Sequence, residues 1–328
     1  MVDNTLLSEF PEVTMAFAYG SGVFMQQDNE NAKENMLDLL FVVDNSLQWH
    51  QENLNRNKFH YSIARVFGPK VITSLQEDLG ASIYYNTLVQ CQGRLLKYGV
   101  ISRNQFLGDL VSWRSLYVSG RLHKPIKFLG RCPSVIRVAM ETNLNHALQT
   151  SLLCLPDHFP DEQLYLLIAN LSYAGDFRMI VGEHKNKVAN IVQPNLERFR
   201  ELYAPFLSED KSLVINNNYV HQKSDIETRY ERLKGLPGNL KRRIVSWRMG
   251  GLKFQQFKDP SLQIQDAVLY SLAHDREKTK ALILKGTRSI VRSSSLSQSL
   301  KGILTAGMLK TVVYSGKKLG KMFHGMLK

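Results

Sequence analysis

The chain has 328 residues and a formal net charge of +13, with 44% hydrophobic and 22% charged residues. This composition is typical of a folded protein of about two domains and excludes a largely disordered or collagen-like chain. Three cysteines without a C-x-x-C pair exclude a disulfide framework and a four-thiolate zinc site. No apolar run reaches the ~18–20 residues that span a bilayer, and the acidic start MVDNTLLSEF does not resemble a secretory signal. We therefore expect a protein that is neither integral to a membrane nor secreted.

Strands and helices are predicted to alternate in the N-terminal third. Apolar runs bounded by turn residues predict strands at 13–19, 36–43, 82–90, 95–102 and 124–129. Helical patterns are found at 62–79 and 104–116. We therefore expect a mixed α/β (α+β) domain over residues 1–130.

Beyond Pro133 the pattern becomes helical. Helices are predicted at 134–155, 161–173, 186–207, near 225 and at 264–274. The polar segment 208–224 predicts a loop or an insertion, and the Ser-rich segment 293–299 predicts a hinge. We expect a mainly helical domain over residues 131–275 and a tail over residues 276–328.

The positive charge is concentrated in this tail. Residues 278–328 contain eleven Lys and Arg and no Asp or Glu, which leaves +2 of the total of +13 for residues 1–277. From residue 304 onward, apolar residues recur on one side of a helix and lysines on the other. A basic amphipathic helix of this kind fits an anionic membrane surface. The residues expected to meet the membrane are Leu304, Met308, Val312, Lys317, Lys318, Leu319 and Phe323.

Two other interpretations of the tail are open. An amphipathic helix can dock on the protein's own core, and a basic segment can bind nucleic acid. The absence of acidic residues favours lipid over the first, and the Leu/Met/Phe stripe is not needed for the second. We expect no nucleic-acid partner.

A glycine turn follows the first predicted strand, and an acid lies on the second. Gly20, Ser21 and Gly22 can bring backbone N–H groups and a hydroxyl close to a triphosphate. Asp38 can hold Mg²⁺ against the same phosphates. This order resembles the DNA polymerase β-type nucleotidyltransferase fold, which usually has a second acid two residues further on. This chain has Leu40 there, so the second metal ligand must come from elsewhere or from substrate phosphates.

Ten motifs extend the resemblance from Phe17 to Gly307. In chain order they are AYGSGVF, DLLFVVD, WHQENLNRN, HYS, FGPKVITS, YYN, GRLLKYGVIS, GRLHKPIK, LSYAGDFRM and GEHKNKVANIV. Together they resemble the translocator assembly and maintenance family, the mitochondrial CDP-diacylglycerol synthases (phosphatidate cytidylyltransferases). The match is weakest over residues 208–258.

The resemblance implies a nucleotidyltransferase domain, Mg²⁺ dependence, and peripheral attachment to the matrix face of the inner mitochondrial membrane. The implied reaction converts CTP and phosphatidic acid into CDP-diacylglycerol and pyrophosphate, for synthesis of cardiolipin and phosphatidylglycerol. Such a reaction needs cations rather than a Ser-His-Asp triad, because the attacking phosphate is already ionised. The expected catalytic residues are Asp38, which is also the metal ligand, Lys97, Lys124 and Asp176. The expected nucleotide-binding residues are Gly20, Ser21, Gly22, Lys70, Tyr84, Arg121 and Arg178.

Two alternative functions match parts of the pattern. A nucleotidyltransferase that acts on nucleic acid should be basic along its catalytic domain, whereas residues 1–277 carry only +2. A non-enzymatic inner-membrane assembly factor would not need the glycine turn with Asp38 or the ordered lysine motifs. The sequence does not indicate an oligomeric state.

Overall fold

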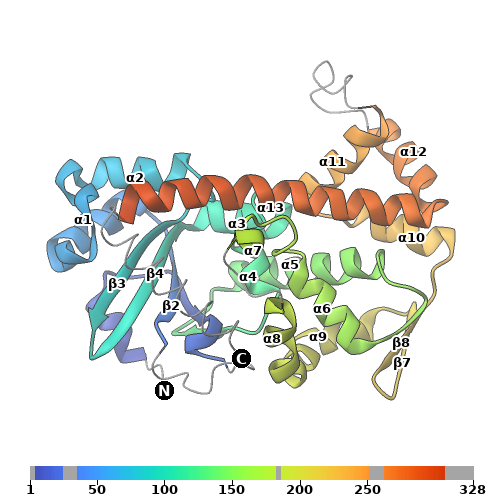
Figure 1. The fold of residues 1–328 in the computed structure, drawn as a ribbon, viewed down its shortest axis with the longest axis horizontal. Coiled ribbons are helices and arrows are strands. Elements are labelled where there is room, and N and C mark those ends of the chain that lie inside the picture. The colour runs from blue at the N-terminus through green and yellow to red at the C-terminus, as the bar shows by residue number, and fades with distance from the viewer. Residues whose placement is uncertain (1–3, 25–34, 182–185, 251–261, 307–328) are drawn as a thin grey trace.

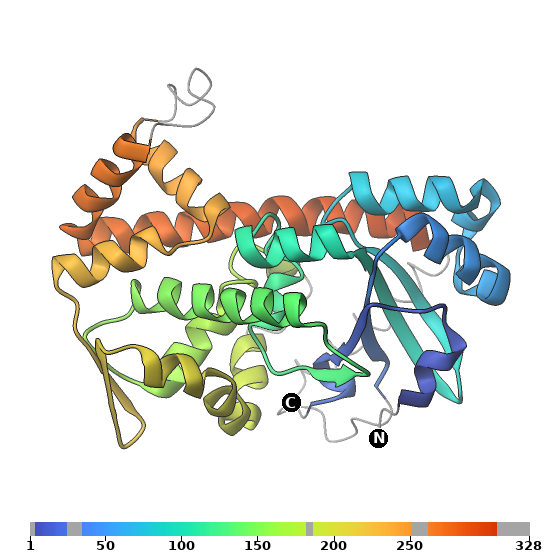
Figure 2. The ribbon, with the colours of Figure 1, turned by 180° about the vertical axis from the view of Figure 1, so that it is seen from behind.

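The computed structural model describes residues 4–24, 35–181, 186–250 and 262–306. One lobe is built on a five-stranded sheet, and the second lobe is mostly helical. A long helix, α13 (Arg276–Ala306), runs along both lobes (Figures 1 and 2). The prediction of a mixed α/β chain is confirmed. None of the described helices is both long enough and apolar enough to cross a bilayer.

Five strands form the main sheet in the order β3-β4-β2-β1-β5. The β2–β4 pair is parallel and the other pairs are antiparallel. Asp38 on β2 therefore lies between Tyr19 on β1 and Lys97 on β4. The strands are β1 (Met15–Tyr19), β2 (Leu37–Val43), β3 (Tyr84–Cys91), β4 (Arg94–Ser102) and β5 (Lys127–Leu129).

The alternation of side chains along β2 sends neighbouring residues to opposite faces of the sheet. Leu39 and Phe41 pack beneath α1 (Ser46–Asn57) and the 3-10 helix η1 (Asn4–Glu9). Leu40 and Val42 pack against α3 (Arg103–Ser112) and α4 (Ser119–Leu122). By the same alternation, Asp38 shares the second face, on the side of the helical lobe.

The edge of the sheet at β3 is covered by two 3-10 helices, η3 (Lys58–His60) and η4 (Ile63–Phe67), followed by α2 (Gly68–Asp78). The predicted helix at 62–79 is thus interrupted at Gly68, whose φ is +78°, and restarts with Pro69 in its first turn.

The helical lobe encloses the largest apolar core of the described residues, which includes Trp113, Leu148, Tyr165 and Tyr203. Its helices are α5 (Ser134–Leu152), α6 (Asp161–Asn170), α7 (Arg178–Val181), α8 (Lys187–Val192), α9 (Leu196–Glu209), α10 (Ile226–Lys234), α11 (Gly238–Arg248) and α12 (Leu262–Ala273), with the 3-10 turn η5 (Gln193–Asn195).

The prediction of a loop over 208–224 was wrong for its centre. β7 (Leu213–Asn216) and β8 (Tyr219–Gln222) form a hairpin there, to which β6 (His158–Pro160) adds a third strand. Asn217 and Asn218 have φ of +47° and +63°. Positive φ at both central residues is what a two-residue type I′ hairpin turn requires, and asparagine tolerates it.

The prediction of a hinge at 293–299 was also wrong, because this segment is a continuous part of α13. Ser297 Oγ donates to the Ser293 carbonyl at 2.8 Å, and Ser294 Oγ donates to the Val291 carbonyl at 3.1 Å. Ser294 and Ser295 are buried. Small hydroxyl residues therefore let α13 pack closely here instead of breaking it.

Candidate active site

The predicted turn and the predicted acid are neighbours. β1 ends at Tyr19, and the 3-10 turn η2 (Gly20–Gly22) follows it beside the start of β2. Gly20 has a φ of +77°, and a Cβ placed on it would lie 3.5 Å from Asp38 Oδ2. Glycine fits this position because it adopts positive φ without strain. The turn therefore borders the Asp38 carboxylate.

Lys97 is the direct partner of Asp38. The two residues face each other across the parallel β2–β4 pair, and Lys97 Nζ lies 3.7 Å from Asp38 Oδ1. Their side chains are 17% and 24% exposed, so a ligand can reach them. The Nζ–Oδ1 distance of 3.7 Å is too long for a hydrogen bond. The pair can open to give the carboxylate to a metal ion and the ammonium group to a phosphate.

Three tyrosines and an arginine surround this pair. Lys97 Nζ lies 4.7 Å from the ring centroid of Tyr85, whose hydroxyl is 3.4 Å from that of Tyr19. Arg121 Cζ lies 5.3 Å from the ring centroid of Tyr19 and 4.1 Å from that of Tyr117. Arg121 Nη1 donates to the Tyr117 carbonyl, and its buried Nε has no hydrogen-bond partner among the described residues. Low-polarity walls around cations strengthen their attraction for an anion.

The absence of a side chain at Gly99 allows Tyr85 to lie across β4. The two residues are opposite each other in the β3–β4 pair. A Cβ on Gly99 would come within 2.6 Å of both Tyr85 Cε1 and Ile83 Cδ1. Gly99 thus determines the position of the Tyr85 ring, which Lys97 contacts.

The cations create a positive potential that is visible in the pKa of Tyr117. Burial alone would raise the pKa of this phenol. Arg121, Arg178 and Lys97 outweigh the burial and lower the pKa to about 8. Tyr19 shows the opposite balance, because burial raises its pKa to about 12 despite Arg121. Arg121, Arg178 and Lys97 therefore all stabilise the ionised form of Tyr117.

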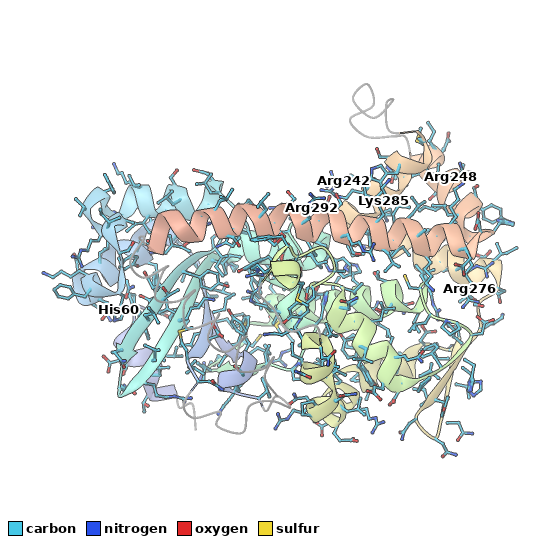
Figure 3. The ribbon with its side chains drawn as sticks, in the orientation of Figure 1. His60, Arg242, Arg248, Arg276, Lys285 and Arg292 are labelled. Carbon is cyan, nitrogen blue, oxygen red and sulfur yellow. The ribbon has the colours of Figure 1, made fainter. Side chains whose placement is uncertain are left out.

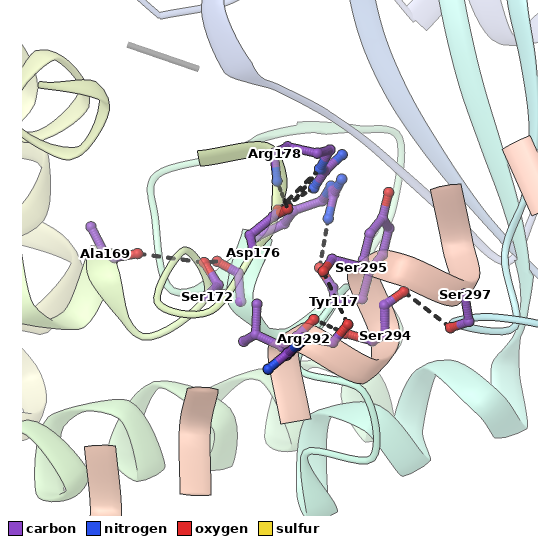
Figure 4. Close-up of polar contacts among 12 residues, drawn as sticks. Tyr117, Ala169, Ser172, Asp176, Arg178, Arg292, Ser294, Ser295 and Ser297 are labelled. Atoms are coloured by element: carbon purple, nitrogen blue, oxygen red, sulfur yellow. Dashed lines mark hydrogen bonds and ion pairs between the residues drawn. The ribbon is translucent and has the colours of Figure 1, made fainter. Parts of the chain in front are cut away.

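Asp176 and Arg178 act as one unit. Arg178 Nε donates to Asp176 Oδ1 at 2.9 Å and Oδ2 at 3.1 Å, and the Arg178 amide donates to Oδ1 at 3.0 Å (Figure 4). Asp176 is buried, and its loop packs on α13: a Cβ on Gly175 would lie 2.5 Å from the Arg288 carbonyl oxygen. Asp176 therefore holds the Arg178 side chain in place.

Lys124 occupies the turn after α4. Its Nζ donates to Ser172 Oγ at 3.1 Å and to the Gly120 carbonyl, and it lies 5.2 Å from the ring centroid of Tyr173. Burial, with a smaller contribution from Arg121, lowers the pKa of Lys124 to about 7. Its contacts join α4 to the loop after α6.

Asp109 on α3 was not found from the sequence, yet it organises the loop that carries Tyr117. Its Oδ1 accepts from the amides of Ser115 and Leu116 and from Ser115 Oγ, at 2.7–3.1 Å. Its Oδ2 accepts from the amides of Val118 and Ser119 and from Ser119 Oγ, at 2.9–3.0 Å. An acid inside a helix gives no sequence signal for such a role, because most such acids are solvated.

The side chains of the site could hold a magnesium ion only if a bound nucleotide supplied further oxygen ligands. Within the described residues, no group of three or more His, Cys, Asp or Glu side chains could hold a metal ion. Leu40, at the expected position of a second acid, is fully buried in the core that contains Phe17 and Val42. Mg²⁺ typically keeps several waters and binds one or two carboxylates together with substrate phosphates. Asp38 and the phosphates of a nucleotide satisfy that minimum.

Not all predicted residues come together. Lys70 is exposed on α2. Tyr84 is buried in a separate cluster with Tyr61 and Ile72, so the structure brings Tyr85 instead of Tyr84 to the site. Of the residues expected to meet the membrane, Leu304 lies in the last turn of α13. Met308, Val312, Lys317, Lys318, Leu319 and Phe323 lie outside the described residues.

Comparison with known proteins assigns the class of this site. The model of a family described as "Phosphatidate cytidylyltransferase, mitochondrial" matches residues 4–321. Proteins with the same name from Xenopus laevis and Bos taurus are 44% and 43% identical over 98% of this chain and over 94% and 95% of their own lengths. The protein of that name from Caenorhabditis elegans is 38% identical over 96% of this chain and 97% of its own length.

The chain is therefore an enzyme of the nucleotidyltransferase type. It belongs to the family of mitochondrial phosphatidate cytidylyltransferases.

Proposed function

We propose that this chain transfers the cytidylyl group of CTP to phosphatidic acid, forming CDP-diacylglycerol and pyrophosphate. The observation that carries the proposal is the Asp38–Lys97 pair beside the Gly20–Gly22 turn, with Arg121 and Arg178 nearby. The names and identities of the relatives support the choice of both substrates.

The reaction does not require a strong general base, because the attacking phosphate oxygen is already ionised. An ionised oxygen of the phosphatidate phosphate attacks the α-phosphorus of CTP, a new P–O bond forms, and the bond to the β-phosphate oxygen breaks to release pyrophosphate. The protein must bring two polyanions together and neutralise the charge that develops. Lys97, Arg121 and Arg178 supply positive charge within one partly enclosed site, and the tyrosine rings reduce its contact with water.

We further propose that Asp38 holds a magnesium ion against the triphosphate, where the ion would neutralise charge on the phosphate oxygens. The weak pairing of Asp38 with Lys97 leaves its carboxylate available for this role. Asp176 does not suit it equally well, because its oxygens already accept from Arg178. The strand, turn and acid in this order also support a nucleotidyltransferase-like fold for the first lobe.

The proposed location is the matrix side of the inner mitochondrial membrane, as a peripheral protein that contributes to cardiolipin synthesis. The mitochondrial names of the relatives support the organelle. The lysines and apolar residues of 304–328 support attachment to an anionic surface. A nucleic-acid substrate is the second candidate, and the small charge of residues 1–277 argues against it.

The test is cytidylyl transfer from labelled CTP to phosphatidic acid in cardiolipin-containing vesicles, with Mg²⁺ or with EDTA. Asp38→Asn should reduce the rate about 100-fold or more, as the loss of one preorganised electrostatic group typically does. Asp44→Asn is the matched control, because Asp44 follows the other end of the same strand and is 59% exposed. Its rate should equal that of the wild type.

Two results would contradict the proposal. Equal rates for Asp38→Asn and the wild type would show that the reaction does not require the Asp38 carboxylate. A wild-type chain that binds vesicles but forms no CDP-diacylglycerol would show that the substrates are different.

A further inference from the structure

Large apolar side chains are exposed together at one end of the molecule. Phe59 on η3 is 73% exposed, and Ile63, Val66 and Phe67 on η4 are 65%, 74% and 63% exposed. We call these four residues the end patch. It lies at the end of the sheet lobe where His60 is labelled in Figure 3. Clustered apolar side chains on a protein surface indicate a site of association.

The end of α13 lies against the same region. α13 contacts η4 and β3. Gln298 Oε1 accepts from the Ala81 amide at 3.0 Å, and Lys301 Nζ donates to the Leu79 carbonyl at 2.7 Å, so this end of α13 is firmly attached. Leu296 and Leu300, one helical turn apart, are 49% and 57% exposed. The exposed apolar surface of this end of the molecule therefore comes from two segments far apart in sequence.

The charges on the segment that carries the end patch have one sign. Residues 53–76 contain no Asp or Glu, whereas Lys58, Arg65 and Lys70 are all exposed. Lys58 Nζ and Arg65 Cζ lie 5.1 Å and 5.5 Å from the ring centroid of Phe59. Cations placed beside exposed apolar groups match an interface that presents anionic headgroups above hydrocarbon.

Charge also discriminates between possible occupants of the end patch. Residues 307–328 carry five lysines and no acid, so that segment has the same sign as the patch and is not complementary to it. A two-fold dimer would place the same patch on both subunits, and its cations would then face each other. An anionic bilayer has the opposite sign and also accepts the apolar side chains.

We propose that the end patch inserts into the surface of an anionic membrane and fixes the enzyme on the bilayer. The proposal rests on the proposed function in one respect: phosphatidic acid lies in the bilayer, so an enzyme that uses it must bind the membrane surface. The end patch is an attachment point within the sheet lobe, in addition to the one proposed for residues 307–328.

The direct test places a tryptophan in the patch of the full chain. Val66→Trp is compared with Val135→Trp, because Val135 on α5 is similarly exposed at 64%. The probe is a vesicle of phosphatidylcholine and cardiolipin with brominated acyl chains, which quench only indoles that enter the hydrocarbon. Val66→Trp should be quenched and its emission shifted to the blue, while Val135→Trp should match the background of the three native tryptophans.

A second pair of variants measures the strength of docking. Val66→Glu should weaken binding to the same vesicles about tenfold or more, because burial of one valine side chain accounts for at least that factor. Val135→Glu should leave binding unchanged. Equal quenching of the two tryptophan variants, or equal binding of the two glutamate variants, would overturn the proposal. Blue emission of Val66→Trp without vesicles would also overturn it, because the patch would then be covered by the chain itself or by a second copy.

Failure of the proposed function would look different. Val66→Glu should keep the wild-type rate with a short-chain, water-soluble phosphatidic acid and lose it with vesicles. A wild-type protein that is inactive with both substrates would refute the cytidylyltransferase proposal, whereas the quenching result would still decide whether the patch enters a membrane.

Discussion

Replacement of Asp109 by asparagine tests whether this one carboxylate holds the loop that carries Tyr117. Asp109 accepts hydrogen bonds from four backbone amides and two serine hydroxyls. In Asp109→Asn one of the two oxygens becomes an NH₂ group, which cannot accept. The serine hydroxyl on that side can rotate to accept from it, but two backbone N–H groups lose their partner.

Each buried N–H without a partner costs about 1–3 kcal/mol, so the loss of two partners in Asp109→Asn should lower the free energy of unfolding by about 2–6 kcal/mol. The measurement is denaturant unfolding followed by circular dichroism. Asp44→Asn is the control, because its exposed carboxylate binds Thr14 and Arg103 at the surface, and its loss should cost about 1 kcal/mol or less. Equal losses in the two variants would refute the reasoning and show that the amides of this loop find other partners.

Gly99→Ala should displace the Tyr85 ring, lowering the rate of cytidylyl transfer and the free energy of unfolding by about 1–3 kcal/mol, the usual cost of overpacking. Unchanged turnover would show that the ring position is unimportant. Burial lowers the pKa of Lys301 to about 7, against about 10.4 in an unfolded chain, so the unfolded state binds more protons between these values. The free energy of unfolding should therefore rise from pH 7 to pH 10, and Lys301→Met should show a smaller rise in unfolding curves at these pH values. Deletion of residues 307–328 should weaken binding to cardiolipin vesicles while leaving CTP binding intact; vesicle binding equal to that of the full chain would refute a role of this segment.

The strands of the main sheet were predictable because each combines a buried apolar run with turn residues at its ends. The pairing of Asp38 with Lys97 was harder to predict from the sequence. Both residues were expected to act, but their adjacency depends on the parallel pairing of β2 with β4, which are more than fifty residues apart. Sequence patterns describe single segments and do not determine which distant strands lie side by side.

Two expectations depended on information that a single segment does not carry. Tyr84 was expected at the nucleotide site, but alternation places Tyr84 and Tyr85 on opposite faces, and the register with Gly99 on β4 brings Tyr85 to the side of Lys97. The Ser-rich segment suggested a hinge by composition, whereas Ser294, Ser295 and Gln298 are buried within the continuous helix α13. The hairpin at 213–222 did have a signal in Asn217 and Asn218.

The attachment of α13 affects how the protein can be made. Domains generally form during synthesis from the N-terminal end, but the Ala81 amide and the Ile83 carbonyl, which lie just before β3, are bonded by the side chain of Gln298, more than two hundred residues later. The sheet lobe therefore lacks these contacts until α13 has been translated. A stop codon just before Gln298 would leave the residues around Asp38 intact in sequence and yet take away contacts that complete the lobe around them.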